Sequence, residues 1–516
     1  MSRSRQEKSL FGAGAGRICA VAAATTARGM MRQVRAALRQ TRTVELRLDW
    51  LRGPSERSSF LNWLRQSRLR GCFIATCRRT AGGGRFTGSP AGELAVLAEA
   101  VRCGCAFCDV EMETAREVSA ALLRQTLAPA RILLSFHDFH GTPASFGKLF
   151  ALGRTLRPAA LKIAAQSQSL AESLRVLRLA RKSGNVVAVP MGETGLPARL
   201  LALRAGSALA YASVEESTAP GQVSLGEMLH LYRAHALTRA TRVYGVIGDP
   251  IGHSLSPLLH NTGFLARRMD AVYLPFLVKE LGDFLRAAPE LGLRGFSVTI
   301  PHKQAILRHL DSCDALAADI GAVNTVTVGA DGSLAGCNTD YVGVLRALSS
   351  RLTLAGSRVL IFGAGGSARA AAFALARAGA VVEICARREE QARELARAAG
   401  GEVIPRRALA TEFFDAILNT TPVGMHPRSG ISPLAPREIN CRIVMDIIYR
   451  PGKTKLLQLA AARGCQTVSG ADMFLAQGIA QWEIWTGRRA PEAAMRRAVL
   501  GVLRAEERSL ATQGRR

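Results

Sequence analysis

The sequence predicts an α/β protein that consists of an N-terminal (β/α)8 barrel followed by a two-lobed α/β unit. In the first half, eight short apolar runs alternate with amphipathic helical stretches, a pattern typical of parallel strands joined by helices. In the second half the alternation restarts and includes a strand, a glycine turn and a helix start, which indicates a nucleotide-binding lobe. At 516 residues the chain is also too long for one ordinary hydrophobic core.

The predicted barrel covers residues 17–236 and follows a flexible tail at residues 1–16. Its strands are expected at residues 18–22, 43–48, 71–77, 107–112, 131–136, 160–164, 186–190 and 208–212. Eight strand–helix repeats indicate a closed barrel, and such barrels build their sites at the C-terminal ends of the strands. The polar residues in or just after these runs are therefore candidates for a site: Glu45, Arg47, Arg78, Glu111, His137 and Lys162.

The second half is predicted to contain a substrate-binding lobe at 242–341 and a nucleotide-binding lobe at 342–508, with a helix at 472–486 packed between them. The candidate cofactor turn lies between an apolar strand and an alanine-rich helix, and its residues are Gly363, Ala364, Gly365, Gly366, Ser367 and Ala368. Glycines there let a pyrophosphate approach amides at a helix N-terminus. The next strand ends in Ala386, Arg387 and Arg388 without an acid at its tip, which favours the 2′-phosphate of NADP.

Lysine is rare in this chain, with eight lysines among the 68 basic side chains. Two of them nevertheless occur at apolar, strand-like runs. Lys162 lies inside one such run, and Lys303 lies at the end of another. A buried amine can lose its proton and form an imine or carry a proton, whereas a guanidinium stays protonated. The alternative is that both lysines are surface residues. Because they lie in different halves, the sequence predicts two active sites.

Composition limits the classes of partner. The net charge of +28 raises the possibility of nucleic-acid binding, but the arginines are spread along helices near glutamates and aromatic residues make up only 5%, so stacking platforms are scarce. A basic surface that favours anionic metabolites is the better interpretation. No apolar run reaches the roughly 18 residues of a membrane span. We expect small-molecule substrates, no nucleic-acid or membrane partner, and a monomer or homodimer.

The cysteines indicate the compartment and argue against a metal site. Eleven scattered cysteines fit a reducing compartment, so a cytoplasmic protein is expected. The one cluster, Cys103, Cys105 and Cys108, has no second Cys/His pair at ligand spacing. No metal is therefore predicted.

The second half resembles shikimate dehydrogenase over about residues 243–508, through motifs at 248–261, 297–303, 321–325, 337–340 and 419–425. The resemblance implies NADPH-dependent reduction of 3-dehydroshikimate, with Lys303 and Asp340 as the catalytic pair. The substrate residues it implies are Ser254, Ser256, Thr299, Asn324, Tyr449 and Gln477. Beside the cofactor it places Thr421, Met425 and Gly470. The chemistry agrees, because a Lys–Asp pair can bind a ketone oxygen and deliver a proton to it.

The first half resembles type I 3-dehydroquinate dehydratase over about residues 17–236, through motifs at 44–49, 76–78, 109–111, 135–139, 161–164, 191–199 and 218–222. The resemblance implies an imine on Lys162, with His137 as acid–base and Glu111 orienting it. The substrate residues implied are Glu45, Arg47, Arg78, Arg199, Thr218 and Gln222. An iminium is an electron sink that acidifies the neighbouring C–H, as the dehydration of a β-hydroxy ketone requires.

The first half departs from the family pattern at three places. Thr218 stands where serine is usual, and Pro197–Ala198 precede Arg199 where the family often has serine. Residues 82–84, all glycine, lack the acid often seen after the Arg78 strand. These departures affect ligand contacts, whereas the three catalytic positions are present.

The sequence thus predicts a bifunctional enzyme that forms shikimate from 3-dehydroquinate in two steps, without a metal. Tethering would raise the concentration of the shared intermediate around the second site. Two alternatives stay open. One is a quinate/shikimate dehydrogenase with a weak or inactive dehydratase domain. The other is a basic nucleic-acid-associated protein built on a retired enzyme.

Overall fold

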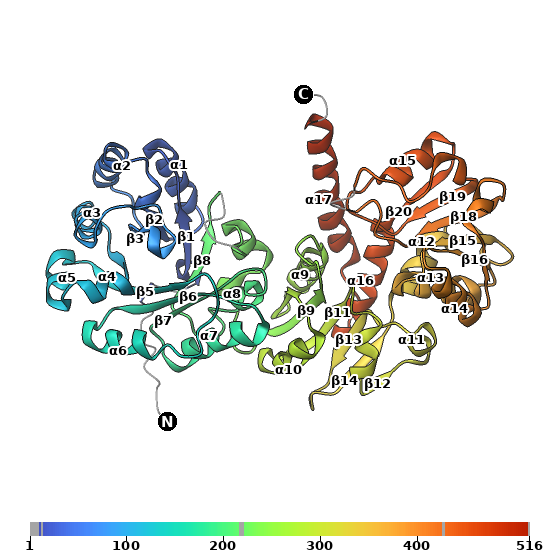
Figure 1. Ribbon diagram of the computed structural model, residues 1–516, viewed down its shortest axis with the longest axis horizontal. Helices are drawn as coiled ribbons and strands as arrows, with labels where there is room; N and C mark the ends of the chain where they lie inside the picture. Colours follow the sequence, from blue (N-terminus) through green and yellow to red (C-terminus); the bar gives the residue numbers. More distant parts are fainter. Residues whose placement is uncertain (1–9, 12–13, 216–220, 426–428, 514–516) are drawn as a thin grey trace. The chain divides into compact units, whose positions relative to one another are not determined.

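The computed structural model describes residues 10–11, 14–215, 221–425 and 429–513 (Figure 1). The chain divides into two compact units, one comprising residues 1–241 with 276–288 and the other 242–275 with 289–516. Within the described ranges, no helix is long and apolar enough to span a membrane.

The first unit contains an eight-stranded parallel sheet in the order β7-β6-β5-β4-β3-β2-β1-β8. Its strands are β1 (Ile18–Ala22), β2 (Thr43–Arg47), β3 (Cys72–Thr76), β4 (Phe107–Glu111), β5 (Arg131–Asp138), β6 (Ala160–Gln166), β7 (Val186–Met191) and β8 (Ala210–Ser213). Ala208 N donates to Val186 O at 2.9 Å, so the segment before β8 closes the ring onto β7. The predicted barrel is confirmed, with strand ends that differ by one or two residues.

Helices connect the barrel strands: α1 (Ala27–Leu38), α2 (Pro54–Gln66), α3 (Pro90–Arg102), α4 (Met112–Glu117), α5 (Ala120–Leu127), α6 (Gly147–Leu156), α7 (Leu170–Lys182) and α8 (Leu196–Leu200). Helix α7 illustrates why they form. The Ser169 side chain accepts from Glu172 N at its start, and Leu170, Leu174 and Leu177 are buried on one face. An N-cap hydroxyl and an apolar stripe at helical spacing are sufficient to define such a helix.

The described part of the predicted N-terminal tail contacts the barrel. Phe11 is 6% exposed and lies with its ring 4.6 Å from that of Phe107, the first residue of β4. Thr43 Oγ1 donates to Gly16 O at 2.6 Å. An aromatic side chain therefore fills space beside the start of the barrel strands, and the ordered packing reaches back to Phe11.

The second unit begins with a mixed six-stranded sheet in the order β10-β9-β11-β13-β14-β12. Its strands are β9 (Arg242–Gly248), β10 (Ala271–Leu277), β11 (Leu293–Val298), β12 (Ser312–Cys313), β13 (Thr325–Val328) and β14 (Leu334–Cys337), and its helices are α9 (Ser256–Ala266) and α11 (Ala315–Ile320). The end of β10 and most of helix α10 (Leu281–Leu291) belong to the segment 276–288 that groups with the first unit. Strand β11 is parallel to β9 and antiparallel to β13. The loop that follows β11 carries Lys303.

A second six-stranded sheet, entirely parallel, has the order β17-β16-β15-β18-β19-β20. The strands are β15 (Arg358–Phe362), β16 (Val381–Cys385), β17 (Glu402–Val403), β18 (Phe414–Asn419), β19 (Cys441–Asp446) and β20 (Gln466–Ser469), with helices α12 (Asp340–Ser349), α13 (Gly366–Arg377), α14 (Glu389–Ala399) and α15 (Lys455–Ala462). The strand order reverses at β15. Ligands of such sheets bind at the carboxyl ends of strands beside this point.

Two C-terminal helices, α16 (Gly470–Thr486) and α17 (Glu492–Gln513), complete the second unit. Helix α16 packs on α9 and α12 and reaches β11, β13 and β20, so it contacts both sheets as predicted (Figure 1). It begins two residues earlier than predicted, because the Ser469 hydroxyl accepts from Ala471 N and caps it. Trp482 is fully buried on this helix.

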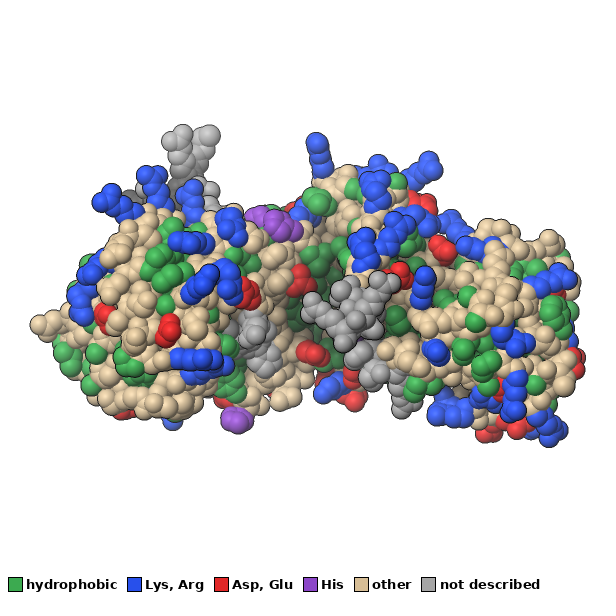
Figure 2. All heavy atoms as spheres, turned by 90° about the horizontal axis from the view of Figure 1, so that it is seen from above, with side chains coloured by type: hydrophobic (Ala, Val, Ile, Leu, Met, Phe, Trp, Pro, Cys, Tyr) green, Lys and Arg blue, Asp and Glu red, His purple; other side chains and the backbone are tan. Residues whose placement is uncertain are grey.

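Surface charge is dispersed. On the face drawn in Figure 2, Lys and Arg side chains are scattered over both units among Asp and Glu rather than aligned in one stripe. Several arginines pair with acids, as Arg377 does with Asp319 at 2.6 Å. On this face, basic and acidic side chains are therefore intermixed.

Candidate active sites

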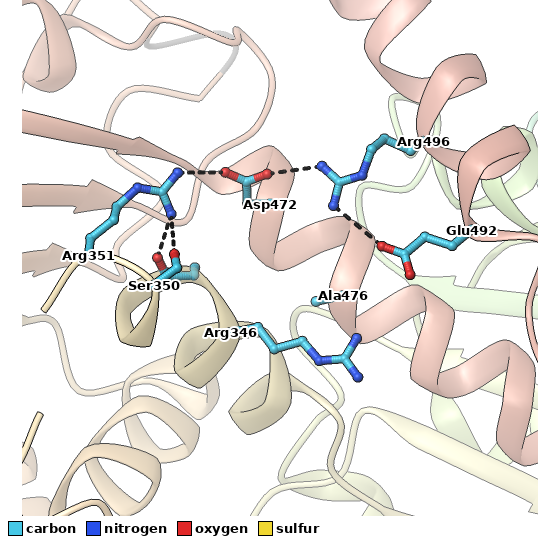
Figure 3. A pocket seen from close by; sticks show the side chains of 8 residues that line it. Arg346, Ser350, Arg351, Asp472, Ala476, Glu492 and Arg496 are labelled. Atoms are coloured by element: carbon cyan, nitrogen blue, oxygen red, sulfur yellow. Dashed lines mark hydrogen bonds and ion pairs between the residues drawn. The ribbon is translucent and has the colours of Figure 1, made fainter. Parts of the chain in front are cut away.

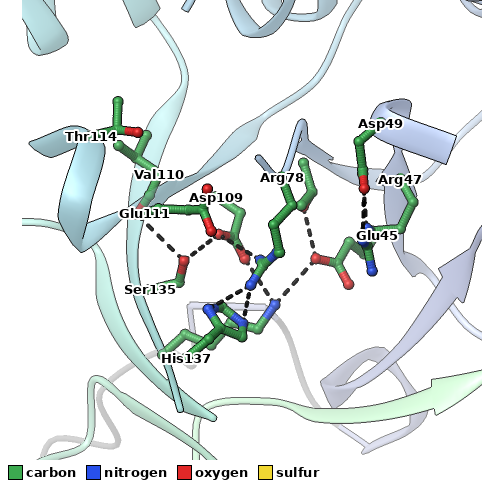
Figure 4. Close-up of polar contacts among 12 residues, drawn as sticks. Glu45, Arg47, Asp49, Arg78, Asp109, Val110, Glu111, Thr114, Ser135 and His137 are labelled. Carbon is green, nitrogen blue, oxygen red and sulfur yellow. Dashed lines mark hydrogen bonds and ion pairs between the residues drawn. The ribbon is translucent and has the colours of Figure 1, made fainter. Parts of the chain in front are cut away.

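The amine of Lys162 lies between two carboxylates, those of Glu45 and Asp109, which Figure 4 shows with their neighbours. Lys162 is 5% exposed on β6, and its Nζ donates to Asp109 Oδ2 at 2.8 Å and to Glu45 Oε1 at 3.1 Å. Thr76 Oγ1 donates to the same Glu45 oxygen at 2.7 Å. The Tyr211 ring lies beside the amine, with its centre 4.2 Å from Nζ. Buried charges need such partners, so the site accommodates a cation on this nitrogen.

Asp109 connects the lysine to the rest of the barrel site. Besides Lys162, it accepts from Arg78 at 3.1 Å and from Ser135 Oγ at 2.5 Å. Burial opposes its ionisation, but the Lys162 ammonium and the Arg78 guanidinium outweigh burial and hold the pKa of Asp109 well below its usual range. No role was predicted for Asp109. It lies two residues before Glu111 on β4, and this spacing, which places both side chains on the same face of the strand, could have indicated that Asp109 belongs to the site.

His137 on β5 lies against Arg78. The Arg78 guanidinium contacts both imidazole nitrogens. Burial, reinforced by the charges of Arg78 and Lys162, lowers the pKa of His137 well below its usual 6.5. A neutral imidazole can accept a proton, so His137 is poised as a general base.

Glu111 lies over the glycine turn rather than on His137. Its Oε2 accepts from Arg79 N at 3.1 Å, and burial raises its pKa. A Cβ atom added to Gly82 would lie 1.8 Å from Glu111 Oε1. The carboxylate therefore occupies the space that a side chain at position 82 would need. Position 82 belongs to the glycine segment 82–84, which lacks the acid often seen in the family. Among the described residues, no hydrogen bond joins Glu111 to His137, and the imidazole contact comes from Arg78 instead.

The other predicted barrel positions are buried or half-buried, or lie outside the described residues. Arg47 makes two hydrogen bonds to Asp49, at 2.9 and 2.8 Å, and both side chains are buried. Arg199 on α8 is 4% exposed, and burial lowers its pKa to about 10. Gln222 is half-buried. Thr218 lies outside the described residues. Asp49, which sequence reasoning did not single out, thus fixes one of the guanidiniums predicted to bind a carboxylate.

The second unit brings Lys303 and Asp340 together. Lys303 Nζ donates to Asp340 Oδ2 at 2.6 Å, and Asp340 is the first residue of α12. Asn324 Nδ2 donates to the other oxygen, Oδ1, at 2.8 Å and lies 3.5 Å from Gln477 Oε1. Three residues predicted from separate motifs, together with the separately predicted Gln477, therefore form one cluster.

The remaining predicted substrate residues surround the loop after β9. Ser256 N donates to Ser254 Oγ at 3.2 Å, and Ser256 is 8% exposed. Burial raises the pKa of Tyr449, opposed by hydrogen bonds that include one with Ser254. The Tyr449 ring stacks on Phe474 at 4.3 Å between centres. Thr299 is half-buried directly after β11.

A buried polar network supports Asn324 from behind, and sequence reasoning missed it. Gln481 Nε2 donates to Asn324 O at 3.1 Å and to Thr325 Oγ1 at 3.0 Å, and its Oε1 accepts from Ser297 Oγ at 2.8 Å. Gln481 lies one helical turn after Gln477 on α16, which places the two amides on one face. That spacing was the signal that could have found it.

The candidate cofactor turn is shaped for close approach of a ligand. Gly363 has φ +124°, a conformation that favours glycine. Nothing lies within 4 Å of a Cβ placed on Gly365, and helix α13 begins at Gly366 without a side-chain cap. The start of α13 therefore has space beside Gly365 and no side-chain cap, which fits an anionic group such as a pyrophosphate.

The end of β16 presents two exposed arginines, Arg387 and Arg388, after the half-buried Ala386. The nearby Glu383 is 7% exposed and is paired with Arg358. Its carboxylate is engaged inside the sheet, and the next acids, Glu389 and Glu390, belong to the first turn of α14, so the two residues at the strand tip itself are basic. These residues fit the 2′-phosphate of NADP.

The loop after β18 is fixed by Asn419. Its Oδ1 accepts from Thr421 N at 3.0 Å and from Thr421 Oγ1 at 2.7 Å. Met425 is 36% exposed. Gly470 leaves no room for a side chain, because a Cβ there would lie 2.3 Å from Ile447 O. Of the three positions predicted beside the cofactor, Thr421 has a hydroxyl held by Asn419, Met425 is exposed, and Gly470 lies against the backbone of Ile447.

A cavity of about 250 Å³ lies among α12, α16 and α17 and is lined by none of the predicted site residues (Figure 3). Its lining is Arg346, Ala347, Ser350, Arg351, Asp472, Ala476, Glu492 and Arg496. Asp472 accepts from Arg351 at 3.4 Å and from Arg496 at 3.3 Å. These pairs brace the helices that carry Asp340 and Gln477.

Within the described ranges, no group of three or more His, Cys, Asp or Glu side chains is arranged to hold a metal ion. The eleven cysteines are free thiols.

Comparisons with known proteins match both halves of the chain to enzyme families. The family model of type I 3-dehydroquinase matches residues 18–238. The models of the shikimate dehydrogenase substrate binding domain and of the shikimate 5'-dehydrogenase C-terminal domain match residues 246–326 and 470–500.

Single proteins also match. The chain is 34% identical over 473 residues to the chloroplastic bifunctional 3-dehydroquinate dehydratase/shikimate dehydrogenase of Arabidopsis thaliana, covering 87% of this chain and 78% of the relative. It is 45% identical over 271 residues to the NADP(+) shikimate dehydrogenase of Bacillus cereus strain ATCC 10987, covering 50% of this chain and 98% of the relative. The structure of shikimate 5-dehydrogenase from Thermus thermophilus in complex with NADP(H) and shikimate is 33% identical, with a TM-score of 0.46 over 50% of this chain and 98% of that one.

Proposed function

We propose that this chain, which belongs to the bifunctional 3-dehydroquinate dehydratase/shikimate dehydrogenase family, dehydrates 3-dehydroquinate to 3-dehydroshikimate and reduces that product to shikimate with NADPH. The observation that carries the proposal is one lysine in each unit, buried in the barrel and half-buried in the second unit, held by a carboxylate at 2.8 Å in the barrel and at 2.6 Å in the second unit. An amine so placed can attack the carbon of a ketone, and its protonated form can donate a proton to the ketone oxygen.

In the barrel, the Lys162 amine attacks the substrate ketone and water leaves, which gives an iminium. His137 removes a proton from the neighbouring carbon, and the electron pair moves into the iminium nitrogen to form an enamine. The enamine expels the β-hydroxyl, which His137 protonates, and water hydrolyses the resulting iminium to free the product and Lys162. Asp109 and Glu45 stabilise positive charge on the nitrogen, and the site's burial excludes other water. Arg47 and Arg199 would bind the substrate carboxylate, since a guanidinium can pair with a carboxylate through two parallel hydrogen bonds.

In the second unit, Lys303 donates a proton to the oxygen of the ketone, and Asp340 holds the ammonium in place. Asn324 and Gln477 bind hydroxyl groups of the ring, and Ser254, Ser256, Thr299 and Tyr449 bind the remainder of the substrate, carboxylate included. NADPH, when bound, supplies the hydride. The residues that would hold it are the amides of the turn after β15, Thr421, and the arginines after β16. The NADP(+) in the names of the bacterial relatives supports this choice over NAD.

We assign the dehydratase to residues 17–236, the shikimate-binding lobe to 242–341 and the NADP-binding lobe to 342–508. Free thiols throughout the chain favour a reducing compartment such as the cytoplasm, although the plant relative is named chloroplastic. The proposed assembly is a monomer or homodimer.

Two assays of the full-length chain test the function. With 3-dehydroquinate alone, the conjugated enone of 3-dehydroshikimate should accumulate. Addition of NADPH should then consume it, and NADH should serve poorly. Turnover of quinate at a rate equal to that of shikimate, with no enone formed from 3-dehydroquinate, would favour a quinate dehydrogenase with an inactive barrel instead.

A further inference from the structure

The Lys303 ammonium has a second partner that comes from the cofactor turn. Its Nζ donates to Asp340 Oδ2 at 2.6 Å and to Ser367 Oγ at 3.2 Å. Ser367 is the second residue of α13, 64 positions along the chain from the lysine. The proton donor of the substrate lobe therefore touches the first turn of the nucleotide lobe.

The stem of Lys303 also lies along this turn. A Cβ added to Gly366 would lie 3.3 Å from Lys303 Cβ and 3.4 Å from its Cδ. A glycine at position 366 thus leaves the space that the lysine stem uses. The contact extends along the side chain and is not confined to its terminal nitrogen.

The Ser367 hydroxyl does not serve the helix itself. Helix α13 has no side-chain cap, and its N-cap position is Gly365. Serine near a helix start commonly bonds to a backbone amide, whereas the hydrogen bond found for this hydroxyl is the one from Lys303. This partner gives the hydroxyl a role in the site rather than in the local fold.

An ammonium group carries three N–H donors. Two fixed acceptors, a carboxylate oxygen and a hydroxyl oxygen, leave one N–H and set its direction. With only the carboxylate, the ammonium could turn about the single contact. A proton donor works best when it is already aimed at the reacting atom.

We propose that Ser367 is a positioning residue for Lys303: its hydroxyl fixes the ammonium so that the remaining N–H faces the reacting oxygen. Because Ser367 belongs to the turn proposed to hold the cofactor phosphates, it also couples the cofactor turn to the proton donor. This inference rests on the proposed reductase activity of the second unit.

The kinetic test compares Ser367→Ala with Ser367→Thr, which keeps the hydroxyl. For reduction of 3-dehydroshikimate, Ser367→Ala should lower kcat roughly tenfold, the loss expected for one hydrogen bond to a charged group. The KM for NADPH should stay within about twofold, since the backbone amides of the turn are unchanged. Ser367→Thr should restore most of kcat. Dehydration of 3-dehydroquinate by the same preparations serves as the control for folding and concentration.

A second readout needs no cofactor. Lys303 is labelled with trinitrobenzenesulfonate at fixed pH without NADPH, and its labelling rate is followed by peptide mass mapping. Loss of an acceptor reduces stabilisation of the ammonium, so Ser367→Ala should label Lys303 severalfold faster than the wild type. Lys453 and Lys455, which lie far along the chain on the α15 segment, provide the reference rate.

Unchanged kcat together with unchanged Lys303 labelling would overturn the proposal. A tenfold rise in the KM for NADPH with unchanged labelling would also overturn it, because Ser367 would then serve the cofactor alone. If the wild type reduced no 3-dehydroshikimate, the proposed function would fail, and the labelling comparison would still decide whether Ser367 positions Lys303.

Discussion

The two lysine sites use the same amine in different surroundings. In the barrel, two carboxylates and an aromatic ring surround Lys162, and its side chain is 6% exposed. In the second unit, one carboxylate and one hydroxyl hold Lys303, and its side chain is 13% exposed. The barrel thus places two anions beside its amine, whereas the second site places one anion and one neutral hydroxyl beside an amine at a more accessible position.

This difference matches the two chemistries. A covalent iminium keeps a positive charge on nitrogen through several steps, so permanent anions close to it lower the energy of each intermediate. A proton relay needs its donor aimed and then reloaded from solvent, and a fully enclosed amine would be difficult to reprotonate. The number of anions around each lysine therefore distinguishes a nucleophile from a proton carrier.

Exchange of each lysine for arginine should produce the largest and most selective effects. Lys162→Arg should lower dehydration at least about a thousandfold, because a guanidinium does not form the imine, and should leave reduction within twofold. Lys303→Arg should lower reduction by about a hundredfold or more and spare dehydration. Steady-state rates of both reactions on each variant check this. Equal losses in both reactions from either exchange would contradict independent sites.

Asp109→Asn should give the next largest effect and should be confined to the barrel. Removing this charge leaves Lys162 and Arg78 with one anion fewer, and breaking a buried ion pair costs about 3–5 kcal/mol. We expect dehydration to fall about a hundredfold and the barrel to unfold at lower denaturant concentration. Ser135→Ala, which removes only a neutral donor to the same carboxylate, is the matched control and should lose less than tenfold. A milder effect of Asp109→Asn than of Ser135→Ala would refute the role given to Asp109.

The pH dependence of dehydration should reflect the environment of His137. Its lowered pKa keeps the imidazole neutral below pH 6.5, so kcat/KM should not fall with an apparent pKa near 6.5 but only at distinctly lower pH. The stability effect has a defined sign. Between the ordinary pKa and the lowered one, the unfolded chain binds the additional proton, so folding stability of the barrel declines as pH falls through this window. Rate profiles and urea unfolding of the wild type and His137→Asn measure both effects. A half-maximal rate at pH 6.5 or above would contradict the neutral base.

The smallest effect is expected at the cavity among α12, α16 and α17. Asp472→Asn removes pairs with Arg351 and Arg496 whose side chains are 28% to 42% exposed. Such pairs contribute up to about 1 kcal/mol and are screened by salt. Thermal unfolding should shift by a few degrees at low salt and little at about 0.5 M salt, because the same screening weakens the pairs there. A large fall in reductase kcat would show instead that this cavity does more than brace the helices.

The strands and most site residues could be predicted from sequence because both depend on local patterns. Apolar runs and glycine turns repeat along the chain, and the motifs around Lys162, Lys303 and Asp340 are contiguous. The structure adds partners that depend on how the strands are arranged around the barrel. The Lys162 amine on β6 reaches Asp109 on β4 although β5 lies between the two strands.

The orientation of Glu111 also could not be read from sequence. Its side chain turns toward Gly82, and the space for it arises from the absence of a side chain on a separate loop. Helical spacing could have indicated Gln481, and the glycine-turn motif includes Ser367. Their partners could not be predicted in this way, because Asn324 lies 157 residues from Gln481 and Lys303 lies 64 residues from Ser367.

The covalent bond to Lys162 is the central claim, and borohydride trapping tests it most directly. The full-length chain is incubated with 3-dehydroquinate, reduced with sodium borohydride, digested and mapped by mass spectrometry. We expect a stable adduct on the peptide that contains Lys162 and none on that peptide in Lys162→Arg. An unmodified Lys162 peptide in enzyme that is actively dehydrating its substrate would contradict this account.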